Sequence, residues 1–146
     1  MKRHINWDSK LFDYIDKEKG IGLEWGYHDC CTLGSGAVHA MTGTDPMAKY
    51  RGDYSSAIGA VKLLRKHGHK SLVSALDEAL GEDREVPFNF IQRGDIMVIT
   101  SSEALVLEEG WSEAVAVCLG EYSAVRSGTL KVLPTYSLNP VKCWRI

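Results

Sequence analysis

The spacing of apolar residues changes part-way along the chain. Up to about residue 80 they recur at intervals of three and four, which predicts helices. Beyond Pro87 they fall in short runs bounded by turn residues, which predicts strands. Helices followed by strands are typical of the α+β class, so we expect N-terminal helices packed on a C-terminal antiparallel sheet or small barrel.

Four helices are predicted, each beginning after a side chain that can accept hydrogen bonds from the first turn and ending at a glycine. Their flanking residues are Asp8 and Gly20, Asp29 and Gly43, Ser55 or Ser56 and Gly68, and Ser71 and Gly81. In the third helix, the period places these residues inward: Ala57, Ile58, Ala60, Val61 and Leu64. Strands are predicted at residues 96–100, 105–107, 114–119, 122–126, 130–133 and 142–146.

The second predicted helix follows an unusual concentration of rare residue types. Its inward face holds small and apolar residues at helical spacing: Cys30, Leu33, Gly34, Ala37, Val38 and Met41. Asp29 caps this helix, so Cys30 is its first residue, where the helix dipole favours a thiolate over a thiol. A nucleophilic cysteine fits this position. A structural interpretation fits as well, with Asp29 only a cap and Cys30 a small residue on a buried face.

Composition and charge narrow the functional classes. The chain has 146 residues, of which 45% are hydrophobic and 25% charged, so we expect one domain spanning residues 1–146. Its net charge is -2 and its Lys and Arg residues are scattered, which argues against nucleic-acid binding. The basic start runs directly into polar residues, so we expect no signal peptide, and the longest apolar run is too short to span a membrane.

The four cysteines show no pattern typical of a metal site or a disulfide framework. Two are adjacent, at Cys30 and Cys31, and the sequence has neither a CxxC pair nor the ligand spacing of a zinc site. We therefore expect four reduced thiols, with Cys118 and Cys143 buried in strands, and neither a metal nor a cofactor.

Several short motifs, in this order and spacing, resemble the NlpC/P60 cysteine peptidases. They are Trp25-Gly26, Asp29-Cys30, residues 93–98 (RGDIMV) and residues 114–120 (AVAVCLG). More closely, the chain is similar to a branch of that superfamily encoded by tailed phages and prophages. The branch also shares residues 41–46 (MTGTDP), residues 50–52 (YRG) and Tyr54, so the resemblance covers nearly the whole chain.

The resemblance implies a papain-like fold and an activity on peptidoglycan stem peptides, with Cys30 as nucleophile. In the family, a histidine that opens a strand supplies the base. Here that strand begins with Ala114, so the histidine position is occupied by alanine.

Two residues are candidates for a substitute base. Among the five histidines, only His28 is close to Cys30 in sequence; His39 points away around the helix, His67 and His69 flank a helix end, and His4 lies in a terminus expected to be frayed. Glu113 is the other candidate. Successive strand residues point to opposite faces, so we expect Glu113 to face away if Ala114 faces Cys30.

These considerations favour a structural protein of the phage tail tip, built on a degenerate peptidase fold and partnered by other tail-tip proteins. We expect it in the host cytoplasm during assembly and then in the virion tail. The alternative is an active endopeptidase or amidase that cleaves peptidoglycan during infection. A third hypothesis is ligand binding in a groove walled by Trp25, Tyr27 and Trp111.

The sequence also suggests a surface for a partner. The loop aromatics and arginine around Tyr50, Arg51, Tyr54 and Trp111 are residue types that concentrate in protein contacts. The same aromatics would equally well pack beneath their own loops.

Overall fold

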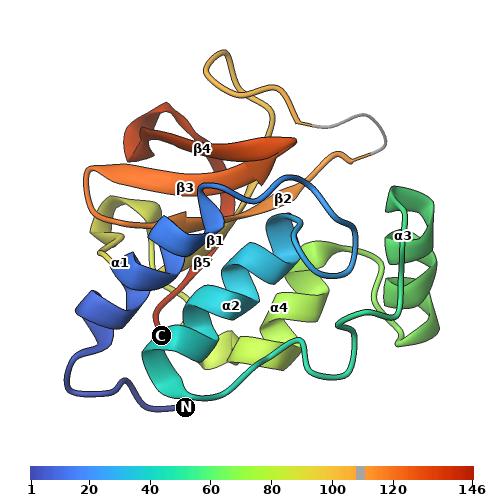
Figure 1. Ribbon diagram of the computed structural model, residues 1–146, viewed down its shortest axis with the longest axis horizontal. Helices are drawn as coiled ribbons and strands as arrows, with labels where there is room; N and C mark the ends of the chain where they lie inside the picture. The colour runs from blue at the N-terminus through green and yellow to red at the C-terminus, as the bar shows by residue number, and fades with distance from the viewer. Residues whose placement is uncertain (108–110) are drawn as a thin grey trace.

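The computed structural model describes residues 1–107 and 111–146, in which helices precede strands (Figure 1). The helices are α1 (Trp7–Glu18), α2 (Cys30–Thr42), α3 (Ala57–Lys66) and α4 (Leu72–Leu80). The strands are β1 (Ile96–Thr100), β2 (Ala114–Cys118), β3 (Tyr122–Ser127), β4 (Thr129–Pro134) and β5 (Asn139–Trp144). Single 3-10 turns occur at Glu82–Arg84, Phe88–Phe90 and Thr135–Ser137.

The strands form one antiparallel sheet in the order β4-β3-β2-β1-β5. Ile96 of β1 pairs with Val117 of β2 on one side and with Trp144 of β5 on the other. The pairing of β1 with β5 shifts register between Val98 and Ile99, so β5 bends where it crosses β1. The predicted α+β class is confirmed.

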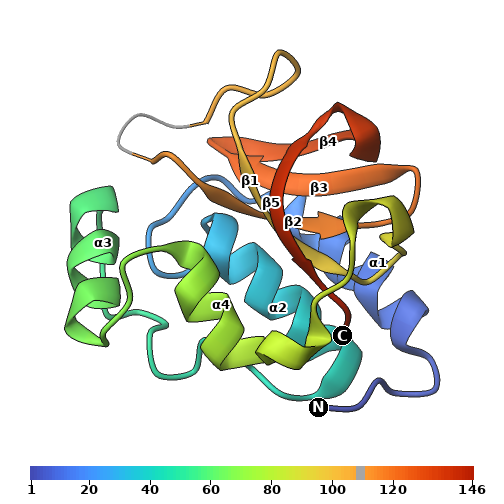
Figure 2. The same ribbon diagram turned by 180° about the vertical axis from the view of Figure 1, so that it is seen from behind.

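The strands β1 and β2 are buried on both faces of the sheet, but by different kinds of structure. Helices α1 and α2 lie across one face, where Val115 and Val117 pack against Leu33 and other helix residues (Figures 1 and 2). The opposite face, which includes Met97 and Ala116, packs instead against side chains from irregular segments, such as Leu105. Cys118 and Cys143 are buried on this second face, as predicted, and all four cysteines are free thiols.

Small residues in α2 let the helix lie very close to its neighbours. A Cβ atom added at Gly34 would overlap Cγ1 of Val115, and one added at Gly36 would overlap the hydroxyl of Tyr14. Glycine has poor helix propensity, so this close packing must offset its cost within the helix.

Three local predictions were wrong. Helix α1 is preceded by Asn6 rather than capped by Asp8, whose carboxylate instead accepts a bond from Ser9 N within the first turn. Residues 105–107 are not a strand: their leucines are buried, but the backbone of Leu105 bonds back to Ser102 in a turn. Ile58 of α3 is 70% exposed, because Ala60 lies on the buried side of that helix.

Asp95 holds the two ends of the chain together. Its buried carboxylate accepts hydrogen bonds from Gln92 N at 2.8 Å and from Arg145 at 3.1 Å, and lies 3.8 Å from Arg3. His4 N also donates to Met41 O at 2.8 Å. The N-terminal segment was predicted to be frayed, and this hydrogen bond shows that it is held in place instead.

Within the described ranges, no helix has the length and apolar character needed to cross a membrane.

Candidate functional site

Asp29 organises the start of α2 and is almost completely buried. Its Oδ1 accepts from Thr32 N at 2.9 Å, while Oδ2 accepts from Gly26 N at 2.9 Å and from Tyr54 Oη at 2.5 Å. Thr32 Oγ1 accepts from Asp29 N in return, at 2.7 Å, which completes a capping box. The cap was predicted, and the structure shows that both carboxylate oxygens are used to support the loop and the helix.

The hydroxyl of Tyr54 remains a donor in this arrangement. Burial, first of all, and then the neighbouring Cys31 and Asp29 raise its pKa far above the usual value for tyrosine. Tyr54 therefore keeps its proton and remains able to donate this hydrogen bond at neutral pH.

Cys30 and Ala114 line the same small cavity. Cys30 is 8% exposed at the first position of α2, and Ala114 is 4% exposed at the first position of β2. The cavity measures about 20 Å³, which is enough for about one water-sized group. Its other walls include Trp25, Trp111 and Arg126. We call it the Cys30 cavity.

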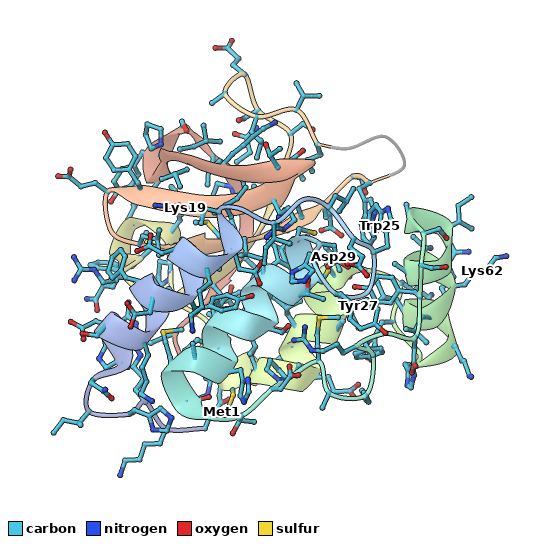
Figure 3. All side chains as sticks on the ribbon, in the orientation of Figure 1. Met1, Lys19, Trp25, Tyr27, Asp29 and Lys62 are labelled. Carbon is cyan, nitrogen blue, oxygen red and sulfur yellow. The ribbon has the colours of Figure 1, made fainter. Side chains whose placement is uncertain are left out.

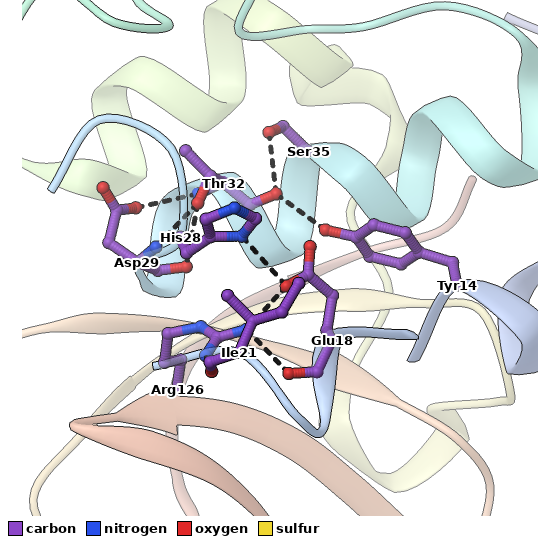
Figure 4. A network of polar contacts seen from close by, with 8 residues as sticks. All are labelled: Tyr14, Glu18, Ile21, His28, Asp29, Thr32, Ser35 and Arg126. Carbon is purple, nitrogen blue, oxygen red and sulfur yellow. Dashed lines mark hydrogen bonds and ion pairs between the residues drawn. The ribbon is translucent and has the colours of Figure 1, made fainter. Parts of the chain in front are cut away.

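None of the five histidines lines the Cys30 cavity. His28 turns toward α1 instead, where its Nδ1 lies 3.1 Å from Glu18 Oε2 (Figure 4). His39 and His67 are exposed. His69, which was predicted to lie beside a helix end, is buried and bonds to Ser74 Oγ at 2.8 Å.

Glu113 shares the Cys30 cavity with Ala114, contrary to the prediction from strand alternation. The reason is that β2 begins at Ala114, so Glu113 precedes the strand and is not bound by its alternation. A glutamate therefore borders the cavity that contains Cys30.

Arg126 of β3 is a site residue that the sequence reasoning missed. It is 3% exposed, and its Nη2 donates to Glu18 Oε2 at 2.8 Å while Nη1 donates to Ile21 O (Figure 4). Its Nε has no partner among the described residues, although the residue lines the Cys30 cavity. The available signal was a charged residue two positions after Ala124, on the same inward side of a predicted strand.

Cys31 stands beside Cys30 but faces another cavity. The two sulfur atoms are 3.9 Å apart. The hydrogen bond with Cys30, followed by burial, raises the pKa of Cys31 well above its usual value, so this thiol keeps its proton. It lines an apolar cavity of about 70 Å³ between α2, α3 and α4.

The predicted groove residues are only partly brought together. Trp25, Tyr27 and Asp29 all lie in the loop that leads into α2 (Figure 3). Trp25 stacks on Trp111, with ring centroids 5.9 Å apart, beside the Cys30 cavity. Tyr27 does not line this cavity; its ring passes over Gly52 and is half exposed.

Two of the four residues of the predicted partner surface are buried, and the other two are partly exposed. Tyr50 lines the cavity between α2, α3 and α4, and Tyr54 bonds to Asp29, so both aromatic side chains pack inward. Arg51 is partly buried and donates to Asp45 Oδ2 at 3.0 Å and Ser35 Oγ at 2.9 Å. These side chains hold the loop between α2 and α3 in place and leave little surface for a partner.

A family model described as a domain of unknown function, DUF6950, matches residues 2–146. The chain belongs to this family. Neither a curated protein nor a solved structure matches the chain.

In this DUF6950 domain, the Cys30 cavity combines a thiol, a carboxylate and donor groups without an imidazole. Trp111 Nε1, like Arg126 Nε, is buried and has no partner among the described residues. The same part of the chain contains no group of three or more His, Cys, Asp or Glu residues that could hold a metal ion. The arrangement can accommodate a small hydrogen-bond acceptor, but it lacks the usual general base of cysteine catalysis.

Proposed function

We propose that the domain acts as a structural component of a phage tail tip, built on a cysteine-peptidase-like fold whose catalytic site is incomplete. The resemblance to NlpC/P60 proteins of tailed phages supports the setting. The observation that carries the proposal is that Ala114, rather than an imidazole, lines the cavity with Cys30. Fold alone assigns no activity, so the contents of the site decide the function.

Acyl transfer by cysteine needs a group that removes the thiol proton and later protonates the leaving amine, within hydrogen-bond reach. His28 is engaged with Glu18 and does not line the cavity. Glu113 does line it, but a carboxylate beside a thiol disfavours the thiolate, because like charges repel. Loss of one member of a catalytic unit commonly removes most of the rate.

A different exposed surface is available for assembly. Phe12 of α1, Tyr122 of β3 and Val132 of β4 are exposed and line a surface depression that also includes charged residues. Exposed apolar side chains within a polar rim are typical of protein contacts. This depression replaces the loop around Tyr50 as the surface proposed to meet other tail-tip proteins.

The catalytic half of the proposal is tested with purified protein and peptidoglycan stem peptides, followed by mass spectrometry of the products. We expect no cleavage by the unmodified protein or by Cys30→Ala. Hydrolysis by the unmodified protein that Cys30→Ala abolishes would overturn the structural role.

The assembly half is tested in phage particles. A phage carrying Cys30→Ser should form infectious particles at the parental titre, as should the matched control Cys31→Ser. Tyr122→Asp, at the proposed contact surface, should block tail assembly while the purified domain stays folded. Normal assembly with Tyr122→Asp would remove this surface from the proposal.

An active cysteine endopeptidase or amidase is the second candidate, and one observation favours it. Glu113 lines the Cys30 cavity together with Arg126 and Trp111, and each of these two residues has a buried N–H without a partner among the described residues. A carboxylate can accept a proton, and buried donors can stabilise a developing negative charge on oxygen. If cleavage is found, its loss in Glu113→Gln would assign the base.

A further inference from the structure

The apolar cavity between α2, α3 and α4 is separate from the chemistry at Cys30. It measures about 70 Å³, and we call it the α3 cavity. Aliphatic side chains from all three helices and the sheet form its walls, among them Val38, Leu63, Leu64, Leu72, Leu76 and Val115. Among the described residues, Trp111 is the one that lines both the α3 cavity and the Cys30 cavity.

Helix α3 forms one wall of this cavity without being closely packed into the core. Only Ala60 of that helix is buried, and Leu63 and Leu64 remain partly exposed although they line the cavity. The helix stands to one side of the other elements in both ribbon views (Figures 1 and 2). The leucines of α3 therefore face a space that the side chains of the described residues do not fill.

Tyr50 places an unpartnered hydroxyl at this apolar space. The residue is 6% exposed and lines the cavity, and its Oη has no hydrogen-bond partner among the described residues. Outside the cavity lining, Lys49 Nζ lies 5.2 Å from the centre of its ring and the His67 ring lies 4.8 Å from it. A buried hydroxyl has lost its bonds to water, so native structures nearly always supply a replacement partner. Trp111 Nε1, which borders the same cavity, is also buried without a partner in that part of the chain.

The charges around the cavity decide what kind of acceptor could satisfy these donors. The lining contains no Asp, Glu, Lys, Arg or His among the described residues. A carboxylate or an ammonium group would lose its water there without gaining a counter-ion, which is strongly unfavourable. A neutral carbonyl oxygen requires no counter-ion and accepts from a hydroxyl or an indole N–H.

We propose that the α3 cavity binds a neutral aliphatic carbonyl compound, such as a short branched amide. The aliphatic part lies among the leucines of α3 and α4, and the carbonyl oxygen accepts a hydrogen bond from Tyr50 Oη. The cavity has about half the volume of the ~150 Å³ engineered cavity that binds benzene, so it suits a branched chain of about four or five carbons.

The test titrates 3-methylbutanamide into the full chain and follows the methyl and indole resonances by NMR, with the thermal midpoint as a second readout. We expect saturable shifts at residues that line the α3 cavity. 3-Methylbutanoate and 3-methylbutylamine share the aliphatic chain but are charged at neutral pH, so they should bind at least tenfold more weakly than the amide. Binding of either charged compound as tightly as the amide would overturn the proposal.

Two variants separate the hydrogen bond from the cavity volume. Tyr50→Phe removes only the hydroxyl and should weaken amide binding by about threefold to tenfold without lowering the thermal midpoint. The matched control is Tyr136→Phe, because Tyr136 is exposed and does not line the cavity. Ala75→Leu, which extends a lining side chain of α4, should abolish binding.

Two results would contradict the assignment: no saturable binding of the amide, or binding that both Tyr50→Phe and Ala75→Leu leave unchanged. If Ala75→Leu does not fold, the comparison of Tyr50→Phe with Tyr136→Phe still decides the matter. Cys30→Ala should leave amide binding unchanged, which keeps this test separate from any activity at the Cys30 cavity.

Discussion

Tyr54 Oη donates a 2.5 Å hydrogen bond to Asp29 Oδ2, which links the segment before α3 to the first turn of α2. The two residues are 25 positions apart in sequence. Asp29 thus supports three groups at once: the helix amide of Thr32, the loop amide of Gly26 and this hydroxyl. Its carboxylate has a structural role next to a cysteine whose position resembles that of a nucleophile.

Asp29→Ala should lower the free energy of unfolding by about 2–4 kcal/mol, because it removes a helix cap and leaves a buried hydroxyl without a partner. Tyr54→Phe, which removes one of the three bonds, should cost about 1.5–3 kcal/mol. Urea unfolding of both variants measures the difference. An unchanged unfolding midpoint in Asp29→Ala, together with altered alkylation of Cys30, would point instead to a catalytic role.

Cys30→Ser should leave stability within about 1 kcal/mol, since it exchanges one small side chain for another at a cavity that contains unpartnered donors. Thermal denaturation of the variant checks this. Thiol titration of the unmodified protein in denaturant without reductant should find four thiols. A count of two would reveal a disulfide and contradict the free thiols of the structure.

Arg126→Met should destabilise the protein by about 3–5 kcal/mol, because it leaves the buried carboxylate of Glu18 without its cationic partner. Adding Glu18→Gln to the same chain should recover part of that loss. Lys49→Met provides the control, since the pair of Lys49 and Glu78 is solvent-exposed and its loss should change stability little. Equal losses from Arg126→Met and Lys49→Met would contradict the importance of the buried pair.

Stability should decrease between about pH 9 and pH 11. Burial, and secondarily the charge of Asp95, raises the pKa of the Cys143 thiol from 9.0 to about 11. Because the folded-state pKa lies above the unfolded value, the contribution of this thiol is complete below about pH 9 and is lost as pH rises to 11. In urea titrations over this range, Cys143→Ala should give a flatter pH dependence than the unmodified protein. Parallel curves would show that Cys143 contributes nothing to it.

Gly34→Ala should destabilise the protein by about 1–3 kcal/mol, because the new Cβ overlaps Val115 Cγ1. Combining it with Val115→Ala removes the overlapping atom, so the double variant should lose less than the sum of the two single losses. Gly22→Ala is the control, since its Cβ would meet nothing within 4 Å. Strict additivity of Gly34→Ala and Val115→Ala would rule out the proposed contact.

The sequence by itself determined the class of the fold and most element bounds. The caps at Asp29, Ser56 and Ser71 were readable because a capping bond joins residues three positions apart. The change of apolar period near Pro87 could also be recognised in the sequence, because the period depends only on the local geometry of a helix or a strand. The position of Ala114 at the start of a strand followed from that pattern.

Only the tertiary structure decided which side chains accompany Cys30. Glu18 and Arg126 are 108 positions apart, and their pairing buries a guanidinium in a residue that lines the Cys30 cavity, while His28 contacts the same Glu18 rather than the cavity. Likewise, Tyr50 and Tyr54 are residue types that are common in contact surfaces, but both are buried. Local patterns specify hydrogen bonds within a turn, whereas burial and long-range ion pairs depend on how the elements pack. The spacing of residues in the sequence therefore could not predict which side chains surround Cys30.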